Sequence, residues 1–352
     1  MKPNVLPFIR EKWNGVPEPT QSFDSKIVLI TGANVGLGFK AAAKFAVHGA
    51  HQVILGVRNV SKGNTAKKQI DALITQFTTG KHCKIDVWEL DMNSFNSIQL
   101  FAQRAKKELP RLDVVVLNAG VSPKDYIVES EGWESILQVN VLGTALLGLL
   151  LLPKLKASSA ENDLSHLVVV TSEAHRWLED KDFPDTKPYD GNLLAAINAR
   201  PENGKAWDGM LQNARSKLFA MYITQALADL AAKKGGVPDT IVTSVCPGAC
   251  KSDLTRSFKD AGIGYTVGLK LFDLLFNKTT EQGARVYVNT ASVGQEGHGA
   301  WWKTTALTTP GDFVTSEKGR KMQKQVWGEI LQALKAEVSK TEDLMEGAVW
   351  PV

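Results

Sequence analysis

The chain has 352 residues, of which 43% are hydrophobic, 41 are lysine or arginine and 37 are aspartate or glutamate. This length and apolar content allow a large buried core in one or two domains. A formal net charge of +4, with no dense block of basic residues, argues against a nucleic-acid-binding protein.

The cysteines and the apolar segments favour a cytoplasmic protein that does not span a membrane. Three cysteines are an odd number and lack the spacing of metal ligands, so no metal site is expected. Residues 1–24 are expected to be an N-terminal arm, because they contain neither the apolar stretch nor the cleavage site of a signal peptide. The most apolar window, 144–152, is far shorter than the roughly 20 residues of a membrane span, and Pro153 is expected to end it.

Short β-branched segments alternate with longer helical patterns along most of the chain. Strands are predicted, in order, at 27–31, 53–57, 84–90, 113–117, 167–171 and 240–245. Helices are predicted at 36–48, 61–76, 93–108, 131–152, 209–232, 280–291 and 316–338. This alternation is typical of a parallel sheet, and the unbroken apolar strands indicate helices on both faces. The expected fold is α/β, a single Rossmann-type doubly wound parallel sheet flanked by helices, in one domain over 25–340 with a tail at 341–352.

Two long segments, 175–212 and 254–278, fit no strand or helix of a minimal sheet. Such insertions in a compact domain often form lids or binding loops, so both are expected to shape a substrate pocket. Their aromatic residues favour a bulky apolar small-molecule substrate, although packing onto the sheet is the simpler role. For 254–278, a membrane-surface or dimer patch is a further alternative.

A glycine-rich turn follows the first predicted strand and opens the first predicted helix. Its glycines let the backbone turn sharply and approach a pyrophosphate, whose charge is favoured at a helix N-terminus. The preceding strand and the following helix supply the context that this motif requires. The residues of the turn expected to bind a dinucleotide are Gly32, Asn34, Val35, Gly36, Leu37 and Gly38.

The spacing Thr-Gly-x-x-x-Gly-x-Gly resembles that of the short-chain dehydrogenase/reductase superfamily, and further motifs follow in the family's order over about residues 25–305. The resemblance implies a nicotinamide dinucleotide cofactor and an oxidoreductase activity. The residues that it places around the cofactor, from the adenine to the nicotinamide, are Asp91, Asn118, Ala119, Gly120, Lys217, Pro247, Gly248 and Ser252.

Within that superfamily, the chain is most similar to the retinol-dehydrogenase-like branch and particularly to its fungal members. The supporting segments are 58–62, 172–175, the long insertion before Lys217, and 312–316. This resemblance implies either an enzyme of fungal secondary metabolism or a reductase of lipophilic carbonyl compounds.

The end of the second predicted strand bears on which dinucleotide is bound. Enzymes that bind NAD usually place an acidic residue there, which holds the ribose 2′-hydroxyl and repels a 2′-phosphate. This chain has no acid at that position and has Arg58 instead, whose guanidinium suits a phosphate. The sequence therefore predicts NADP(H), with a solvated loop arginine as the alternative role for Arg58.

The catalytic set of the family is incomplete in this chain. The resemblance assigns carbonyl polarisation to Ser172, a water relay to Asn140 and the active-site lysine to Lys217, but Asn213 stands where the family has its proton-donating tyrosine. An amide donates hydrogen bonds and does not give up a proton at accessible pH. Losing a positioned general acid typically lowers the rate by about 10²- to 10⁴-fold. Glu173, next to the serine, is expected to face solvent.

Other side chains could replace the missing tyrosine as the proton donor. Tyr126, Tyr189 and Tyr265 lie in or near the pocket-forming segments and are candidates. His175 is another, because imidazole titrates near neutral pH, although a hydrogen bond that orients its loop is the favoured role. Tyr222 follows the lysine by five residues and therefore lies on a different face of the same helix.

Three functions follow from this reading. The first is an NADP(H)-dependent reductase of a bulky apolar carbonyl or imine, in which another group, or water held by Lys217, supplies the proton. The second is a redox-neutral cyclase or isomerase that uses Ser172, Asn213 and Lys217 as an electrostatic cradle. The third is a non-catalytic dinucleotide-binding partner protein. Helix 131–152 and the lysine helix match the family's dimer-forming pair, so they either form a homodimer or only cover the sheet.

Overall fold

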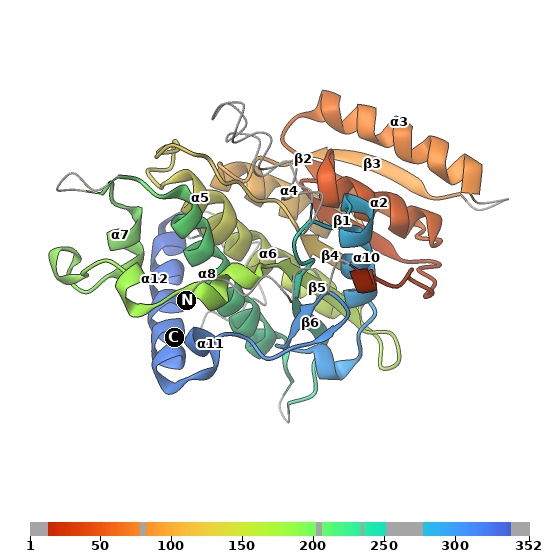
Figure 1. Ribbon diagram of the computed structural model, residues 1–352. Helices are drawn as coiled ribbons and strands as arrows, with labels where there is room; N and C mark the ends of the chain where they lie inside the picture. Colours follow the sequence, from red (N-terminus) through yellow and green to blue (C-terminus); the bar gives the residue numbers. More distant parts are fainter. Residues whose placement is uncertain (1–12, 78–81, 202–205, 234–235, 251–276, 339–352) are drawn as a thin grey trace.

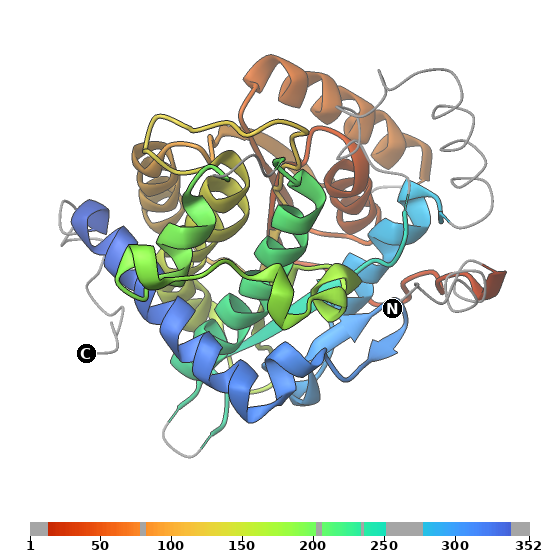
Figure 2. The same ribbon diagram turned by 60° about the vertical axis from the view of Figure 1, so that its left-hand side comes forward.

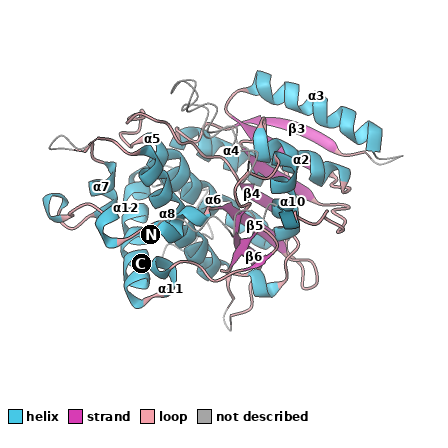
Figure 3. Ribbon diagram, viewed as in Figure 1, coloured by secondary structure: helices cyan, strands magenta, loops and turns pink. Residues whose placement is uncertain are grey.

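The computed structural model describes residues 13–77, 82–201, 206–233, 236–250 and 277–338. Within these ranges one sheet has the strand order β3-β2-β1-β4-β5-β6-β7-β8 (Figures 1 and 3). Strands β1 to β7 are paired in parallel, and β8 runs antiparallel to β7. The strands are β1 (Ile27–Thr31), β2 (Gln52–Val57), β3 (Lys84–Glu89), β4 (Val114–Leu117), β5 (Ser165–Val170), β6 (Thr240–Cys246), β7 (Trp301–Lys303) and β8 (Ala306–Leu307).

Helices cover both faces of this sheet, as the sequence predicts. One apolar cluster packs α2, α3 and α10 against one face, and a larger cluster packs α4, α6 and α8 against the other (Figure 1). The principal helices are α2 (Gly36–Val47), α3 (Val60–Phe77), α4 (Phe95–Glu108), α5 (Ser135–Leu137), α6 (Thr144–Ser158), α7 (Leu193–Asn198), α8 (Gly209–Ala231), α10 (Thr280–Thr290), α11 (Asp312–Thr315) and α12 (Glu317–Val338). The expected doubly wound fold is therefore confirmed.

The apolar helix expected at 131–152 differs from its prediction. It begins at Ser135, passes through a π-helical segment at Gln138–Gly143, and continues through Pro153 to Ser158. The run Ser135–Ser158 is long and apolar enough to cross a membrane, so the expectation of a short window was wrong. Its most apolar window is nevertheless wholly buried inside the protein, which makes it the core helix of one sheet face.

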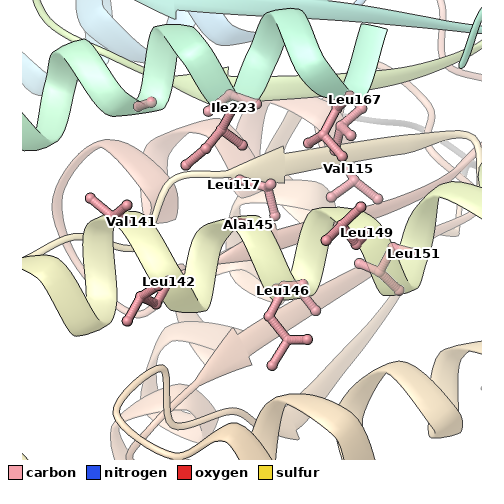
Figure 4. Close-up of a cluster of buried hydrophobic side chains, with 14 of the residues drawn as sticks. Val115, Leu117, Val141, Leu142, Ala145, Leu146, Leu149, Leu151, Leu167 and Ile223 are labelled. Atoms are coloured by element: carbon pink, nitrogen blue, oxygen red, sulfur yellow. The ribbon is translucent and has the colours of Figure 1, made fainter. Parts of the chain in front are cut away.

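Burial on both sides of α6 explains why the helix continues past the proline. Figure 4 shows Leu149 of α6 on the side of Val115, Leu167 and Ile223, whereas Leu146 points away from them on the opposite side of the helix, and all five are buried. Burying an aliphatic side chain contributes about 1.5–3 kcal/mol, so several such contacts exceed the cost of about 3 kcal/mol for one proline in a helix.

The two helices expected to form a dimer are covered within one chain. Helix α12 lies on the outside of α8 and also contacts α7 (Figure 2). The backbone N–H groups of Leu193 and Leu194 in α7 donate to Glu329 of α12 at 3.0 and 2.7 Å, which ties this outer layer together. In α8 only Met210 and Asp229 are exposed. A homodimer through this pair would have to displace the layer, and the homodimer itself stays a prediction.

The end of the expected N-terminal arm packs onto the domain. Val16 and Phe23 are buried, and Arg285 of α10 donates to the carbonyl oxygen of Val16 at 2.9 Å. Several sequence-based predictions lie outside the described residues, namely 1–12 of the arm, 254–276 of the second insertion, the tail 341–352, Ser252 and Tyr265.

Candidate active site

The glycine turn joins the carboxyl end of β1 to the N-terminus of α2. Gly32 and Gly36 have φ angles of +67° and +61°, which side chains rarely tolerate. A Cβ on Gly38 would lie 2.5 Å from Asn118 Nδ2 and 2.6 Å from the oxygen of Gly32, so only glycine fits there. No side chain caps α2 at Val35, and its first turn has no acidic residue. This uncapped N-terminus suits the pyrophosphate of a dinucleotide.

Thr31 fixes the Asn118–Gly120 run beside the glycine turn. Its Oγ1 accepts the backbone N–H groups of Asn118 at 3.0 Å and of Ala119 at 2.8 Å. Asn118 Nδ2 in turn donates to the carbonyl oxygen of Thr31 at 2.8 Å. These hydrogen bonds join the carboxyl end of β1 to the residues that follow β4, so the glycine turn and the Asn118 run lie side by side. Thr31 was not among the predicted site residues, although it stands first in the glycine motif.

The residues predicted to bind the adenosine end lie at the carboxyl ends of β2 and β3. Asp91 Oδ1 accepts the N–H of Asn93 at 3.0 Å, which shapes a tight turn and leaves Oδ2 available. Arg58 is exposed, and among the described residues no ion pair or hydrogen bond holds its guanidinium.

Gly248, which is expected near the nicotinamide, follows β6. It has a φ of +74° and donates its N–H to Cys246 Sγ at 3.4 Å.

Lys217 is buried on α8 and faces the end of β5. Its Nζ donates to the carbonyl oxygen of Val170 at 3.1 Å. Burial lowers the pKa of Lys217 to about 8, because an apolar environment penalises the ammonium ion. Ser172 follows two residues after Val170, and its Oγ accepts the N–H of Ala174 at 3.2 Å. Among the described residues nothing accepts the hydroxyl proton of Ser172, which leaves it free for a ligand.

Asn213 lies one helical turn before Lys217. Its backbone oxygen accepts the hydroxyl of Ser216 at 2.7 Å. Its side-chain Oδ1 is buried and has no donor among the described residues. Leaving a buried acceptor unsatisfied costs about 1–3 kcal/mol. Asn213, which stands where the resemblance expects a tyrosine, therefore has an amide oxygen with no donor among the described residues.

Asn140 forms a clamp within the π-helical segment. Its Oδ1 accepts the N–H of Val121 at 2.9 Å, and its Nδ2 donates to the oxygen of Val121 at 3.0 Å and to Ser216 Oγ at 3.2 Å. With the bond from Ser216 to Asn213, a continuous chain of hydrogen bonds joins the segment after Gly120 to α8. Sequence analysis missed Val121 and Ser216, because both act through neighbours that are distant in sequence.

His175 orients its loop, which was the favoured prediction. Its Nδ1 lies 2.7 Å from the oxygen of Ser172, and its Nε2 accepts the N–H of Gly311 at 3.1 Å, so Nδ1 carries the proton. The ring also packs edge-on against Trp301, with centroids 4.8 Å apart. Burial lowers the pKa of His175 to about 4. Because both ring nitrogens are engaged and the ring is neutral, His175 is not a proton donor to a ligand.

Glu173 does not face solvent as expected. Its Oε1 lies 2.6 Å from the Nζ of Lys303, and both side chains are largely buried. Lys303 belongs to β7, which the sequence did not predict, so this ion pair could not be anticipated. The pair fixes the backbone next to Ser172.

The other tyrosines are engaged or distant from Lys217 in the chain. The hydroxyl of Tyr222 donates to the oxygen of Phe313 at 2.7 Å, and burial raises its pKa. The hydroxyl of Tyr126 donates to the oxygen of Asn198 at 2.8 Å. Tyr189 is half-buried in the first insertion. None of these described contacts joins a phenol to the lysine.

The glycine turn, the Asn118 run, Ser172 and the Nζ of Lys217 lie at the carboxyl ends of the strands of a doubly wound parallel sheet, which is the arrangement of a Rossmann-type dinucleotide-binding fold. Comparison with known proteins narrows this class. A family model described as short chain dehydrogenase matches residues 26–177. The short-chain dehydrogenase/reductase phmF of Phaeosphaeria nodorum is 38% identical over 341 residues, which cover 97% of this chain and 95% of that protein.

A second fungal relative supports the same assignment. The short-chain dehydrogenase/reductase ffsI of Aspergillus flavipes is 37% identical over 329 residues, covering 93% of this chain and 91% of that protein. The chain therefore belongs to the short-chain dehydrogenase/reductase family. Among solved structures, the Pseudomonas aeruginosa RhlG/NADP active-site complex matches with a TM-score of 0.57 and 19% identity, covering 81% of this chain and 96% of that one. At this identity the structure supports the fold alone.

Proposed function

We propose that the protein is an NADP(H)-dependent reductase of a bulky apolar carbonyl or imine, acting in the cytoplasm in fungal secondary metabolism. The observation that carries the proposal is the buried Lys217, whose Nζ donates to the oxygen of Val170, two residues before Ser172, a serine whose hydroxyl proton has no acceptor among the described residues. Fungal relatives similar over nearly the whole chain support the oxidoreductase class. Arg58 has no ion pair or hydrogen bond among the described residues, and with no acid at the end of β2 it supports NADP(H) over NAD(H).

The side chains of the site divide the work of carbonyl reduction. The cofactor, when bound, supplies the hydride. Ser172 donates its hydroxyl to the substrate oxygen, and the amide of Asn213 adds a second donor that keeps its protons. The ammonium of Lys217 donates one N–H hydrogen bond to the carbonyl oxygen of Val170 and has two further N–H groups, one of which delivers its proton through water to the substrate oxygen. The carbonyl thus gains a hydride at carbon and a proton at oxygen, and solvent reprotonates Lys217.

An iminium substrate would need less from this site. Its carbon accepts the hydride, and the positive charge on nitrogen is neutralised without a proton donor. The absence of a phenol at position 213 favours such a substrate over a neutral ketone.

The test compares NADPH oxidation by the natural protein, Asn213→Tyr and Ser172→Ala over bulky ketones, aldehydes and cyclic imines. We expect turnover by the natural protein, a fall of about 10²-fold or more in Ser172→Ala, and faster ketone reduction by Asn213→Tyr. If only Asn213→Tyr oxidised NADPH, the reductase proposal would fail for the natural chain.

The amide at position 213 supports a second candidate, a redox-neutral cyclase or isomerase. Ser172, Asn213 and Lys217 would then stabilise charge developing on a substrate oxygen without net transfer of hydride. This candidate predicts product formation with no change in NADPH absorbance. A non-catalytic binding partner would instead form no product, and its function would survive both Ser172→Ala and Lys217→Ala.

A further inference from the structure

A cavity of about 790 Å³ opens beside the N-terminal end of α8. One wall is the segment Lys124–Tyr126, which follows the Asn118 run. The other comes from the end of the first insertion and the start of α8, and includes Arg200, Trp207 and Met210. Neither wall contains a residue assigned above to the cofactor or to proton transfer.

The position of the cavity relates it to the reacting groups. Gly209 and Met210 line it, and they precede Asn213 by four and three residues on α8. Residues at these spacings lie on the same helix face, so the cavity is about one helical turn, roughly 5 Å, from Asn213 along the helix. The opposite wall begins just after Val121, which Asn140 clamps through both backbone atoms.

Hydrogen bonds and close packing hold both walls in place. The hydroxyl of Tyr126 donates to the oxygen of Asn198 at 2.8 Å, and the rings of Tyr126 and Trp207 meet edge-on with centroids 5.1 Å apart. A Cβ on Gly209 would lie 2.5 Å from the oxygen of Pro123, so glycine allows the walls to meet. The cavity is therefore a preformed site with aromatic walls.

The buried Glu134 connects the cavity walls to α8 through hydrogen bonds. Its carboxylate accepts Gln212 Nε2 at 2.9 Å as well as two backbone N–H groups of α5. Its own N–H donates to Asn198 Oδ1 at 2.7 Å, and Asn198 is the residue that accepts the hydroxyl of Tyr126. Burial raises the pKa of Glu134, which these hydrogen bonds partly oppose.

Two basic side chains in the cavity are available to bind an anion. Lys124 and Arg200 line it, and neither has an ion pair among the described residues. The guanidinium of Arg200 lies 6.0 Å from the centroid of the Tyr126 ring. Of the two acids in the lining, Asp208 is engaged in capping α8 through the N–H groups at 210 and 211, whereas Asp125 is exposed to solvent. Among the described lining residues, Lys124 and Arg200 are therefore available to an anion, because Asp208 is directed at the positive N-terminus of α8 and Asp125 faces solvent.

We propose that this cavity binds the distal part of the substrate and selects a planar aromatic skeleton that carries a carboxylate. The aromatic pair contacts the skeleton, and Arg200 with Lys124 binds the carboxylate. The reacting carbon then lies toward Asn213 and Ser172. This substrate class rests on the proposed reductase function for its reaction, whereas binding in the cavity can be measured without any reaction.

The experiment measures binding of a naphthyl ketone carboxylate and of its methyl ester by calorimetry, with and without NADP⁺. The natural protein should bind the acid at least about tenfold more tightly than the ester. Arg200→Gln should remove most of that preference and change ester binding less than twofold. Lys187→Gln, which removes an exposed lysine of the same insertion outside the cavity, is the matched control and should retain the preference.

Two further readouts separate this proposal from the reductase function. Trp207→Leu should weaken binding of acid and ester alike, and circular dichroism melting should verify that each variant is folded. Equal affinity of the natural protein for acid and ester, or an unchanged preference in Arg200→Gln, would overturn the carboxylate site. Preferential binding of the acid by a natural protein that oxidises NADPH with none of the ketones, aldehydes and cyclic imines would leave the carboxylate site standing and overturn the reductase.

Discussion

The two ends of the site differ in how completely their polar groups are paired. At the glycine turn, Thr31 and Asn118 exchange hydrogen bonds through both side chains and backbone, and Gly38 leaves no free space. On α8, Lys217 has one backbone partner, and the Oδ1 of Asn213 has none among the described residues. The glycine turn, expected to bind the dinucleotide, is interlocked, whereas α8, expected to carry proton transfer, has one buried polar atom with no partner among the described residues.

This difference teaches where the chain departs from its family. The glycine turn, the Asn118 run, Ser172 and Lys217 stand where the resemblance to the family expects them, and Asn213 stands where it expects a tyrosine. Unsatisfied polar groups in folded proteins often mark functional positions, where stability is given up for binding or catalysis.

Gly38→Ala should have the largest effect on dinucleotide binding, because it damages the interlocked end. The added Cβ would lie 2.5 Å from Asn118 Nδ2 and 2.6 Å from the backbone oxygen of Gly32, which is well inside van der Waals contact. The turn would therefore have to open. We expect the dissociation constant for NADP(H), measured by calorimetry, to rise about 100-fold. Gly328→Ala, on an exposed turn of α12 with no neighbour near the new methyl group, is the control and should leave binding unchanged.

The pH dependence of turnover tests whether Lys217 supplies the proton. Reduction needs the protonated form of Lys217, whose pKa is lowered to about 8 by burial. The logarithm of kcat/KM for ketone reduction should therefore be level below pH 8 and fall with a slope near one above it. Lys217→Met should lower the rate by about 10²- to 10⁴-fold and abolish the inflection.

A level profile up to pH 10 in the natural protein would exclude Lys217 as the proton source. Asn213→Tyr offers the complementary comparison, because a phenol near the lysine introduces a second titrating donor. Its profile should therefore differ in shape from that of the natural protein, whereas Asn213→Gln should retain the original inflection.

Arg58→Ala should have an intermediate effect that is confined to the choice of dinucleotide. Loss of a charged hydrogen bond to a phosphate costs about 1.5–3 kcal/mol, which corresponds to a 10- to 100-fold rise in KM for NADPH. The KM for NADH should change little, because NADH lacks the 2′-phosphate. Lys68→Gln removes one exposed positive charge from the neighbouring α3 and serves as the control. Equal effects of Arg58→Ala on both dinucleotides would contradict the NADP(H) assignment.

Most of the fold could be predicted from the sequence because its signals are local. Buried strands such as β1 and β4 are continuous apolar runs, and helices such as α4 begin at capping residues, here Ser94. Strands β7 and β8 were missed because three and two residues are too short for any periodicity. The extension past Pro153 was missed because packing, rather than helix propensity, decides it.

The site could be predicted only as far as its motifs reach. The glycine turn and Lys217 were found through their spacing. The contact between Asn140 and Ser216 spans 76 residues, and the ion pair of Glu173 with Lys303 spans 130, so no local pattern announces either. The cavity beside α8 likewise requires two segments that meet only in the folded chain.

The smallest predicted effect is a change in the free energy of unfolding, and it tests the difference between the glycine turn and α8 most directly. It compares Asn118→Ala with Asn213→Ala. Asn118→Ala removes the 2.8 Å hydrogen bond to the oxygen of Thr31 and should lower the free energy of unfolding by about 1–2 kcal/mol. Asn213→Ala removes a buried oxygen that has no donor and places a better helix former in α8, so it should raise that free energy by up to about 1 kcal/mol. Urea denaturation of the ligand-free protein measures both. Opposite signs would establish that one end is complete before any ligand binds and the other is not, whereas equal destabilisation would mean that Asn213 has a partner in solution and that the contrast fails.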